Sequence, residues 1–161
     1  MSKLTTFLWF NGQAEEAANY YKEVFGAVEI QDIARFGKEA AEMGGMPEGS
    51  AMMVNFTLFG QPFVGLNGGP QYRFNPAISF FISCETQAEI DRYWEMLSAD
   101  PEQEQCGWLV DRFGVSWQIV PALLGQLMSS GTGQQSEAVS HALLQMKKLD
   151  IAGLQAAFDG A

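Results

Sequence analysis

The stretch NGQAE at residues 11–15 opens one helical pattern, and ETQAE at residues 85–89 opens a second one. The tripeptide Gln-Ala-Glu therefore occurs twice, first at Gln13 and again at Gln87. Aromatic residues recur at the same offset, one inside each helix and one in the strand before it: Tyr20 with Trp94, and Phe7 with Phe81. Short-period repeats build solenoids, whereas two long copies indicate a duplicated module. The chain is therefore predicted to contain the same structural unit twice.

A second correspondence lies in the hairpin that closes each unit. The sequence FGQPFV at residues 59–64 matches FGVSWQ at residues 113–118. Each unit is therefore predicted to consist of a strand, a helix and further strands. The sequence separation between the two hairpins is smaller than the separation between the two helices. The second unit is therefore expected to have fewer residues between its helix and its hairpin.

The hydrophobic periodicity predicts the elements of the first unit. Residues 14–25 carry a helical stripe of apolar side chains, and Gly26 supplies the stop. A loop with a short helical turn is expected between residues 37 and 50, where glycine and proline are frequent. Four strands are predicted: Thr5–Phe10, Val28–Phe36, Ala51–Phe59 and Pro62–Leu66.

The second unit follows the same plan and is succeeded by a helical tail. Its expected elements are strand Ala77–Cys84, helix Gln87–Leu97 and a hairpin of Trp108–Phe113 and Val115–Val120. Beyond Pro121 only helices are predicted: Ala122–Met128, Ser136–Lys148 and Ile151–Phe158. Ser136 and Asp150 are suitable N-caps for the last two. The tail contains no catalytic pattern and is interpreted as a lid or packing element.

Composition limits the class of protein. The chain has 161 residues, 47% of them hydrophobic, and no apolar run long enough to span a bilayer. Nine basic and 19 acidic residues give a net charge of −10. This charge repels phosphate backbones and anionic lipid, so nucleic-acid and membrane partners are not expected.

Cys84 and Cys106 are interpreted as reduced thiols. The start of the chain leads directly into a strand without a signal segment, which favours the cytoplasm.

The predicted fold class is α+β. Two paired βαβββ modules, at about residues 3–67 and 75–121, are expected to form a cup-shaped mixed sheet of eight or so strands within one domain, residues 1–121. Residues 122–161 are expected to be a helical extension of that domain. Because each module has a helix on one side only, the other sheet face is left to line a cup, and a cup can hold a ligand.

Side chains alternate between the two faces of a strand, so the sequence indicates which residues line the cup. The parity opposite to the helices is neutral and mixes hydroxyl, amide and aromatic groups. The candidate ligand-binding residues are Thr5, Phe7, Trp9, Asn55, Thr57, Ser79, Phe81 and Gln118. They are expected to share one concave surface. Trp117, at the opposite parity, is expected to be buried.

Several of these residues have a structural interpretation of equal weight. Gln118 can bond a ligand or a neighbouring strand, and Trp9 and Phe81 can stack on a planar ligand or simply pack.

A structural role at the hairpin turn is favoured for the pair Asp111-Arg112, because adjacent strand residues face opposite sides. His141, the single histidine, has no nucleophile or orienting acid near it in sequence and is interpreted as a surface or packing residue.

The chain resembles the vicinal-oxygen-chelate superfamily of glyoxalases, bleomycin-resistance proteins and extradiol dioxygenases. Within it the chain is similar to the PhnB-like branch, whose members often carry the name demethylubiquinone methyltransferase. The resemblance covers nearly the whole chain. It is carried by GGPQYRFNPAISFFISCETQAEIDRYW from Gly68, by CGWLVDRFGVSWQIVP from Cys106 and by MKKLDIAGL from Met146. It implies the glyoxalase fold and a homodimer.

The resemblance also implies where a metal would lie. The four ligand positions of the superfamily, typically His, Glu or Gln, correspond to Thr5, Val64, Ser79 and Gln118 of this chain. A first-row divalent metal needs imidazole, thiolate or carboxylate donors, so no metal and no other cofactor is predicted. The methyltransferase name lacks support in the residues, because neither Gly44-Gly45 nor Gly68-Gly69 opens a helix after a buried parallel strand.

Three functions follow. The favoured one is a small-molecule-binding protein with a neutral polar and aromatic cup. The alternatives are a metal-assisted lyase, isomerase or dioxygenase of the same superfamily, and an interaction protein whose cup has become a packed core. The missing donors weigh against the enzyme, and the neutral polar groups on the cup parity weigh against the packed core. The sequence does not decide whether the protein is an enzyme, and it does not name a ligand.

Overall fold

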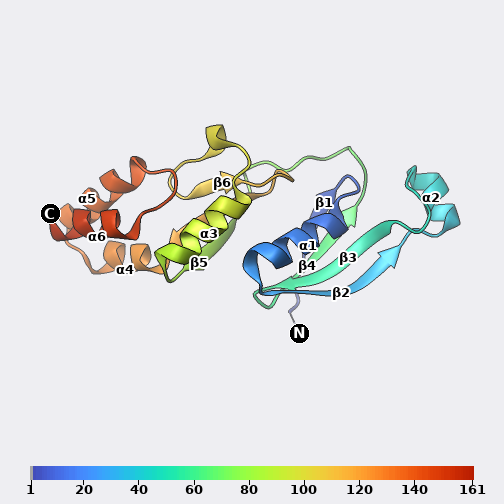
Figure 1. Ribbon diagram of the computed structural model, residues 1–161, viewed down its shortest axis with the longest axis horizontal. Coiled ribbons are helices and arrows are strands. Elements are labelled where there is room, and N and C mark those ends of the chain that lie inside the picture. Colours follow the sequence, from blue (N-terminus) through green and yellow to red (C-terminus); the bar gives the residue numbers. More distant parts are fainter. Residues whose placement is uncertain (1) are drawn as a thin grey trace. The chain divides into compact units, whose positions relative to one another are not determined.

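The computed structural model describes residues 2–161 (Figure 1), and Met1, the first residue of the predicted domain, lies outside them. The chain forms two compact units that divide between Phe74 and Asn75. Each unit contains a sheet with a helix packed on it, so each is described in turn.

The first unit contains a four-stranded mixed sheet. Its strands are β1 (Thr6–Phe10), β2 (Val28–Arg35), β3 (Ala51–Leu58) and β4 (Gln61–Asn67). Their order in the sheet is β1-β4-β3-β2, with β1 parallel to β4 and the other neighbours antiparallel. A short helix, α2 (Lys38–Gly44), occupies the long connection between β2 and β3. The helical turn expected in this loop is therefore confirmed.

Helix α1 (Ala14–Phe25) packs on one face of this sheet. It ends where the sequence predicts, because Gly26 adopts a left-handed conformation with φ 69° and its N–H bonds the carbonyl of Lys22. The N-terminal end is held by the sheet: the side chain of Asn67 accepts a 3.0 Å hydrogen bond from the N–H of Ala14. The core between helix and sheet consists of Ala17, Ala18, Tyr21, Val24, Phe25, Leu8, Phe10, Val54 and Phe56.

The second unit begins with a three-stranded sheet. Its strands are β5 (Phe80–Cys84), β6 (Trp108–Val110) and β7 (Ser116–Pro121), in the order β5-β7-β6 with β5 parallel to β7. Helix α3 (Gln87–Leu97) is capped by the hydroxyl of Thr86, and a 3₁₀ turn (Pro101–Gln103) follows it. The predicted α+β fold class is confirmed. The total is seven strands among the described residues, because the shorter segment between α3 and the hairpin leaves no counterpart of β2.

Three helices complete the second unit: α4 (Ala122–Ser130), α5 (Gly133–Leu144) and α6 (Ile151–Asp159). They enclose a small core of Val120, Leu127, Val139, Leu149 and Leu154. Asp150 is the N-cap of α6, as predicted, and accepts a hydrogen bond from the N–H of Gly153. The expected cap at Ser136 is wrong, because Thr132 and Gln135 form a capping box that starts α5 earlier.

The helical tail is joined to α3 by polar contacts. Gln87 donates to the carbonyl of Leu149 at 3.0 Å and accepts from the N–H of Ile151 at 2.8 Å. Lys148 bonds the carboxylate of Asp91 at 2.6 Å, which lowers the pKa of Asp91. The repeated Gln-Ala-Glu motif thus has an added role in the second unit, where its glutamine holds the tail. None of the helices within residues 2–161 is long and apolar enough to cross a membrane.

Candidate functional site

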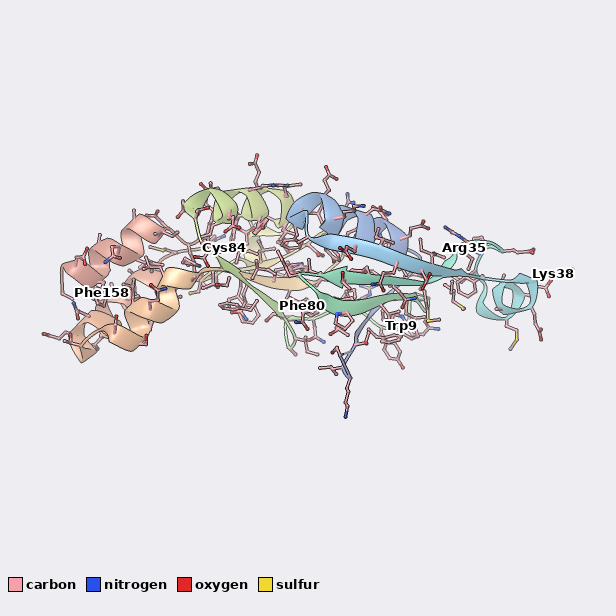
Figure 2. All side chains as sticks on the ribbon, turned by 90° about the horizontal axis from the view of Figure 1, so that it is seen from below. Trp9, Arg35, Lys38, Phe80, Cys84 and Phe158 are labelled. Atoms are coloured by element: carbon pink, nitrogen blue, oxygen red, sulfur yellow. The ribbon has the colours of Figure 1, made fainter. Side chains whose placement is uncertain are left out.

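The sequence repeat is reproduced in the pairing of the strands. In the first unit Phe7 lies beside Val64 across the β1–β4 ladder, and in the second Phe81 lies beside Gln118 across the β5–β7 ladder. The two pairs occupy equivalent positions of the repeat. Each sheet has one face against its helix and one face without a helix, and Figure 2 shows Trp9 on the side of the first sheet opposite to α1. We refer to the faces without a helix as the uncovered faces.

Large apolar side chains stand exposed on both uncovered faces. Phe7 and Phe81 are each 58% exposed, although they lie within strands. Their neighbours along the strands, Leu8 and Ile82, are buried. The alternation predicted from the sequence is therefore present, with the phenylalanine of each repeat turned away from the helix.

The uncharged polar side chains of the first unit lie on the face that the alternation of side chains along the strands predicts. Asn55 and Thr57 are half-buried on β3, and Thr5 is exposed immediately before β1. The amide of Asn55 donates a 3.3 Å hydrogen bond to the backbone carbonyl of Asp32 on β2. The hydroxyl of Thr57 lies beside a pocket that is described below.

Trp9 already has protein partners. Its indole N–H donates a 2.9 Å hydrogen bond to the carbonyl of Gly69, and the ring of Tyr72 meets it edge-on at 5.0 Å. A Cβ at Gly68 would lie 2.2 Å from the indole, so only glycine allows this approach. Of the two interpretations of Trp9, packing is the one for which the structure supplies contacts, since the segment that follows β4 folds onto the ring.

In the second unit two candidate residues bind each other. The amide of Gln118 on β7 donates a 2.9 Å hydrogen bond to the hydroxyl of Ser79, immediately before β5. Trp108 pairs with Gln118 across the β6–β7 ladder and therefore belongs to the same uncovered face. The sequence prediction missed Trp108, although its position at the start of the hairpin strand could have indicated it.

The side chains of β7 that alternate with Gln118 and point to the other face belong to the hydrophobic core. Trp117 is 1% exposed, and its indole N–H donates a 2.9 Å hydrogen bond to the carboxylate of Asp111. The same carboxylate accepts the backbone N–H groups of Phe113 and Val115 at 2.8 and 3.0 Å. Asp111 therefore shapes the hairpin turn, which confirms its structural role. Arg112 places its guanidinium 4.9 Å from the ring centre of Phe113.

The residues at the four positions where the resemblance implies metal ligands do not fit a metal. Thr5 and Ser79 offer hydroxyls, Val64 offers no donor atom, and the amide of Gln118 is bonded to Ser79. Divalent first-row metals prefer imidazole, thiolate or carboxylate ligands. Within the described chain no three His, Cys, Asp or Glu side chains are grouped so that they could hold a metal ion.

The remaining reactive groups lie elsewhere. Cys84 is buried, and burial together with Glu89 and Glu85 raises the pKa of its thiol to about 12. Cys106 is half-buried in a loop, and its thiol donates to the carbonyl of Leu143. His141 is exposed on α5 beside an open pocket of about 430 Å³, whose other lining residues, Gln134, Glu137, Ala138 and Ala161, include no hydroxyl or thiol.

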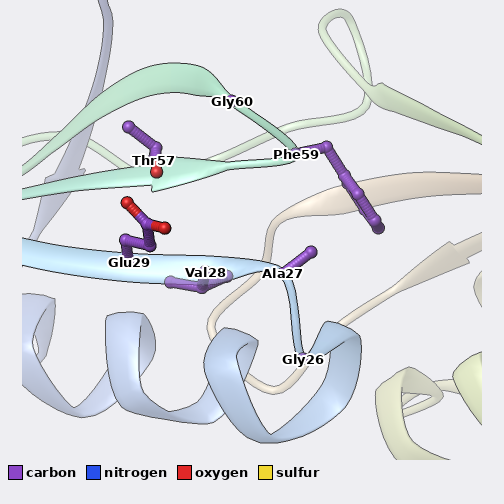
Figure 3. A pocket seen from close by; sticks show the side chains of 7 residues that line it. All are labelled: Gly26, Ala27, Val28, Glu29, Thr57, Phe59 and Gly60. Atoms are coloured by element: carbon purple, nitrogen blue, oxygen red, sulfur yellow. The ribbon is translucent and has the colours of Figure 1, made fainter.

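A further pocket, of about 280 Å³, lies at the end of the β3–β4 hairpin in the first unit (Figure 3). It is lined by Gly26, Ala27, Val28, Glu29, Thr57, Phe59 and Gly60. Thr57 is the one lining residue that the sequence predicted as a ligand contact. The two-residue turn Phe59-Gly60 forms part of its wall, and the Phe-Gly pair indicates the turn in the sequence but not the pocket.

The structure thus brings the candidates together within each unit. Thr5, Phe7, Trp9, Asn55 and Thr57 belong to the first uncovered face, and Ser79, Phe81 and Gln118 belong to the second. The expectation that all eight share one concave surface stays a prediction.

Two units that each pack one helix on one mixed sheet define an α+β protein with an internal structural repeat. The chain belongs to the PhnB-like family described as 3-demethylubiquinone-9 3-methyltransferase, whose model matches residues 2–120. The match ends before α4 begins, so the helical tail lies beyond it.

The chain is also similar to several solved structures. A putative 3-demethylubiquinone-9 3-methyltransferase, PhnB protein, from Bacillus cereus is 37% identical, with 75% of this chain and 100% of that one covered and a TM-score of 0.63. Protein PA1353 from Pseudomonas aeruginosa shares the fold at 20% identity, 75% and 98% coverage and a TM-score of 0.56. A lactoylglutathione lyase from Agrobacterium tumefaciens is 16% identical, with 76% and 95% covered and a TM-score of 0.44. A comparison with curated proteins found no match.

Proposed function

We propose that this protein binds a small molecule on its uncovered sheet faces and does so without a metal. The observation that carries the proposal is the exposure of Phe7 and Phe81, 58% each, at equivalent positions of the two repeats. Exposed aromatic side chains inside strands are costly to leave in water, so each phenylalanine is a candidate contact for an apolar part of a ligand.

The groups around these phenylalanines suit an uncharged or amphipathic ligand. Asn55 and Thr57 flank the first face, and Ser79 and Gln118 the second. None of the four carries a charge, and amide and hydroxyl groups both donate and accept hydrogen bonds. Aromatic rings with a few placed polar groups are the usual lining of small-molecule sites.

The proposal does not include methyl transfer, although the family description names it. Binding the methyl donor in the usual fold needs a glycine-rich turn between a strand and a helix. Gly45 instead ends α2 in a left-handed conformation, and Gly68 lies against the indole of Trp9. Both glycine pairs therefore have local structural roles.

A metal-assisted lyase, isomerase or dioxygenase is the alternative function. It would need donors that Thr5, Val64, Ser79 and Gln118 do not supply. Elemental analysis of purified protein separates the two functions. We expect no stoichiometric metal, and a stoichiometric metal with Gln118 among its ligands would favour the enzyme.

Thermal-shift screening against a library of neutral and amphipathic metabolites tests binding directly. A ligand should raise the melting temperature of the protein, and Gln118→Ala should weaken its binding about fivefold, because one buried hydrogen bond contributes ~1 kcal/mol. Gln126→Ala is the matched control, since Gln126 is exposed on α4. Equal weakening in both variants would contradict a site that includes Gln118.

We also propose that the protein is a homodimer. Leu4 in the first unit and Ile78 in the second are 79% and 75% exposed, so each unit has a further exposed apolar side chain near its phenylalanine in the sequence. Light scattering at tens of micromolar should give about twice the mass of the 17.7 kDa chain. A monomer at that concentration would contradict the proposal.

A further inference from the structure

The pocket at the β3–β4 hairpin has an unusual wall. Leu58 pairs directly with Gln61, so Phe59 and Gly60 form a two-residue turn, with φ angles of 47° and 78°. Such turns favour asparagine, aspartate or glycine at both central positions, because both need positive φ. A bulky side chain in this conformation is an outlier, and strained residues of this kind cluster at functional sites.

The strained backbone conformation of Phe59 positions its aromatic ring at the pocket. The N–H of Phe59 bonds the carbonyl of Ala27 at 2.9 Å, and its ring meets that of Phe25 at 5.7 Å between centres. Phe59 is nevertheless 49% exposed. The contact with Phe25 therefore fixes the ring while much of its surface stays free beside the pocket.

A carboxylate and a hydroxyl lie on the neighbouring strands. Glu29 on β2 and Thr57 on β3 are direct partners in the antiparallel ladder, so their side chains lie on the same face of the sheet. Figure 3 shows both side chains between the strands and the Phe59 ring at the other end of the pocket. Across residues 2–161 no hydrogen bond or ion pair engages the carboxylate of Glu29.

A free carboxylate and a fixed aromatic ring that line one pocket can bind an organic cation between them. The ring face attracts an ammonium group, and the carboxylate neutralises its charge. The net charge of −10 further concentrates cations around the protein. The repeat itself supplies a precedent, because Phe113 corresponds to Phe59 and carries the guanidinium of Arg112 over its ring at 4.9 Å.

We infer that this pocket binds a small organic cation of the alkylammonium type, held by the Glu29 carboxylate, the Thr57 hydroxyl and the Phe59 ring. The volume of about 280 Å³ admits a molecule of a few carbon atoms. The inference rests on the proposed function, because Thr57 belongs to the first uncovered face. It adds the chemical class of ligand and the charged contact of Glu29, which lies beside Thr57 on that face.

Nuclear magnetic resonance titration of the full chain tests the inference. The probes are choline and 3,3-dimethylbutan-1-ol, which has the same shape and no charge. Choline should give saturable shifts of the backbone amides of residues 26–29 and 57–60, and the alcohol should bind more weakly. Equal affinity for both probes, or unsaturable choline shifts spread over acidic residues, would overturn the inference.

Variants define the contribution of each group. Glu29→Gln should weaken choline about fivefold or more, and Phe59→Leu about twofold to fivefold. Asp32→Asn is the matched control, since it removes an exposed carboxylate from the same strand and should leave the affinity unchanged. Phe59→Asn keeps a residue that the turn favours and should weaken choline binding at least as much as Phe59→Leu does, in a folded protein. An unchanged affinity in Glu29→Gln and Phe59→Asn would overturn the assignment of the site.

The outcome is separable from that of the proposed function. If choline does not bind while a library compound shifts the amide resonances around Phe81, only the inference about the cation pocket is wrong. If choline binds at the hairpin and no compound affects Phe7 or Phe81, the wider proposal fails.

Discussion

The amide of Gln118 donates a 2.9 Å hydrogen bond to the hydroxyl of Ser79, so two positions at which the resemblance to the vicinal-oxygen-chelate superfamily implies metal ligands bind each other. Their counterparts in the first unit are Val64, which lacks a donor, and Thr5, which is exposed. A carboxylate or imidazole would be left without a partner at either place unless it held an ion. Because the amide of Gln118 and the hydroxyl of Ser79 satisfy each other, these two positions form a neutral part of the second uncovered face.

The two faces of β7 predict opposite effects of substitution. Trp117→Ala should reduce the free energy of unfolding by roughly 3–5 kcal/mol, because it removes a buried indole and leaves Asp111 without one partner. Gln118→Ala should reduce it by ~1 kcal/mol. Denaturant unfolding measures both values. Trp108→Ala, a half-buried tryptophan on the uncovered face, is the control and should cost roughly 1–2 kcal/mol.

Gly68 tests the attachment of the segment after β4. Gly68→Ala puts a methyl group 2.2 Å from the indole of Trp9, which should cost roughly 1–3 kcal/mol of the free energy of unfolding. Gly125→Ala is the matched control, because nothing lies within 4 Å of its Cβ and it lies inside α4. That variant should stabilise the protein by about 0.5–1 kcal/mol. A neutral Gly68→Ala would contradict the packing of Gly68 on Trp9.

The thiols should differ in reactivity. Burial raises the pKa of Cys84 from an ordinary value of 9.0 to about 12, so its thiol stays protonated in the native protein at pH 8. Iodoacetamide followed by mass spectrometry should find Cys106 modified and Cys84 modified only after denaturation. Equal modification of both thiols in the native protein would contradict the burial of Cys84.

The same shift predicts a dependence of stability on pH. Between pH 9 and about 12 the unfolded thiol loses its proton while the folded one retains it. The contribution of Cys84 is therefore complete below pH 9 and is lost as the pH rises towards 12. Urea unfolding of Cys84→Ala should show a smaller fall in stability over this range than the unchanged protein does.

The helices of the two repeats could be predicted to the residue. Ala14–Phe25 and Gln87–Leu97 were expected from their apolar stripes and have these bounds in the structure. Local signals determine both, since Gly26 ends α1 and Thr86 caps α3. The strand expected from Ala77 begins at Phe80 instead, because the side chain of Asn75 accepts the N–H of Ala77 and forms a turn there.

The pocket could not be predicted in the same way. Glu29 and Thr57 meet because β2 and β3 pair in one register, and that register includes an irregularity after Ile30. Phe59 reaches the pocket because its backbone adopts a conformation that its own propensity disfavours. Long-range pairing and local strain are not visible in a periodic pattern, so the sequence indicated Thr57 but not its neighbours.

Binding of a small molecule to the uncovered faces without a metal can be measured with the neutral fluorescent probe N-phenyl-1-naphthylamine. The protein is first treated with EDTA. The fluorescence of the probe should reach saturation as protein is added. Phe7→Ser and Phe81→Ser should each weaken binding of the probe about twofold to tenfold. Met43→Ser, which changes an 84% exposed side chain on α2, should have no effect. Binding that requires added metal, or equal affinity in all four proteins, would contradict metal-free binding on these faces.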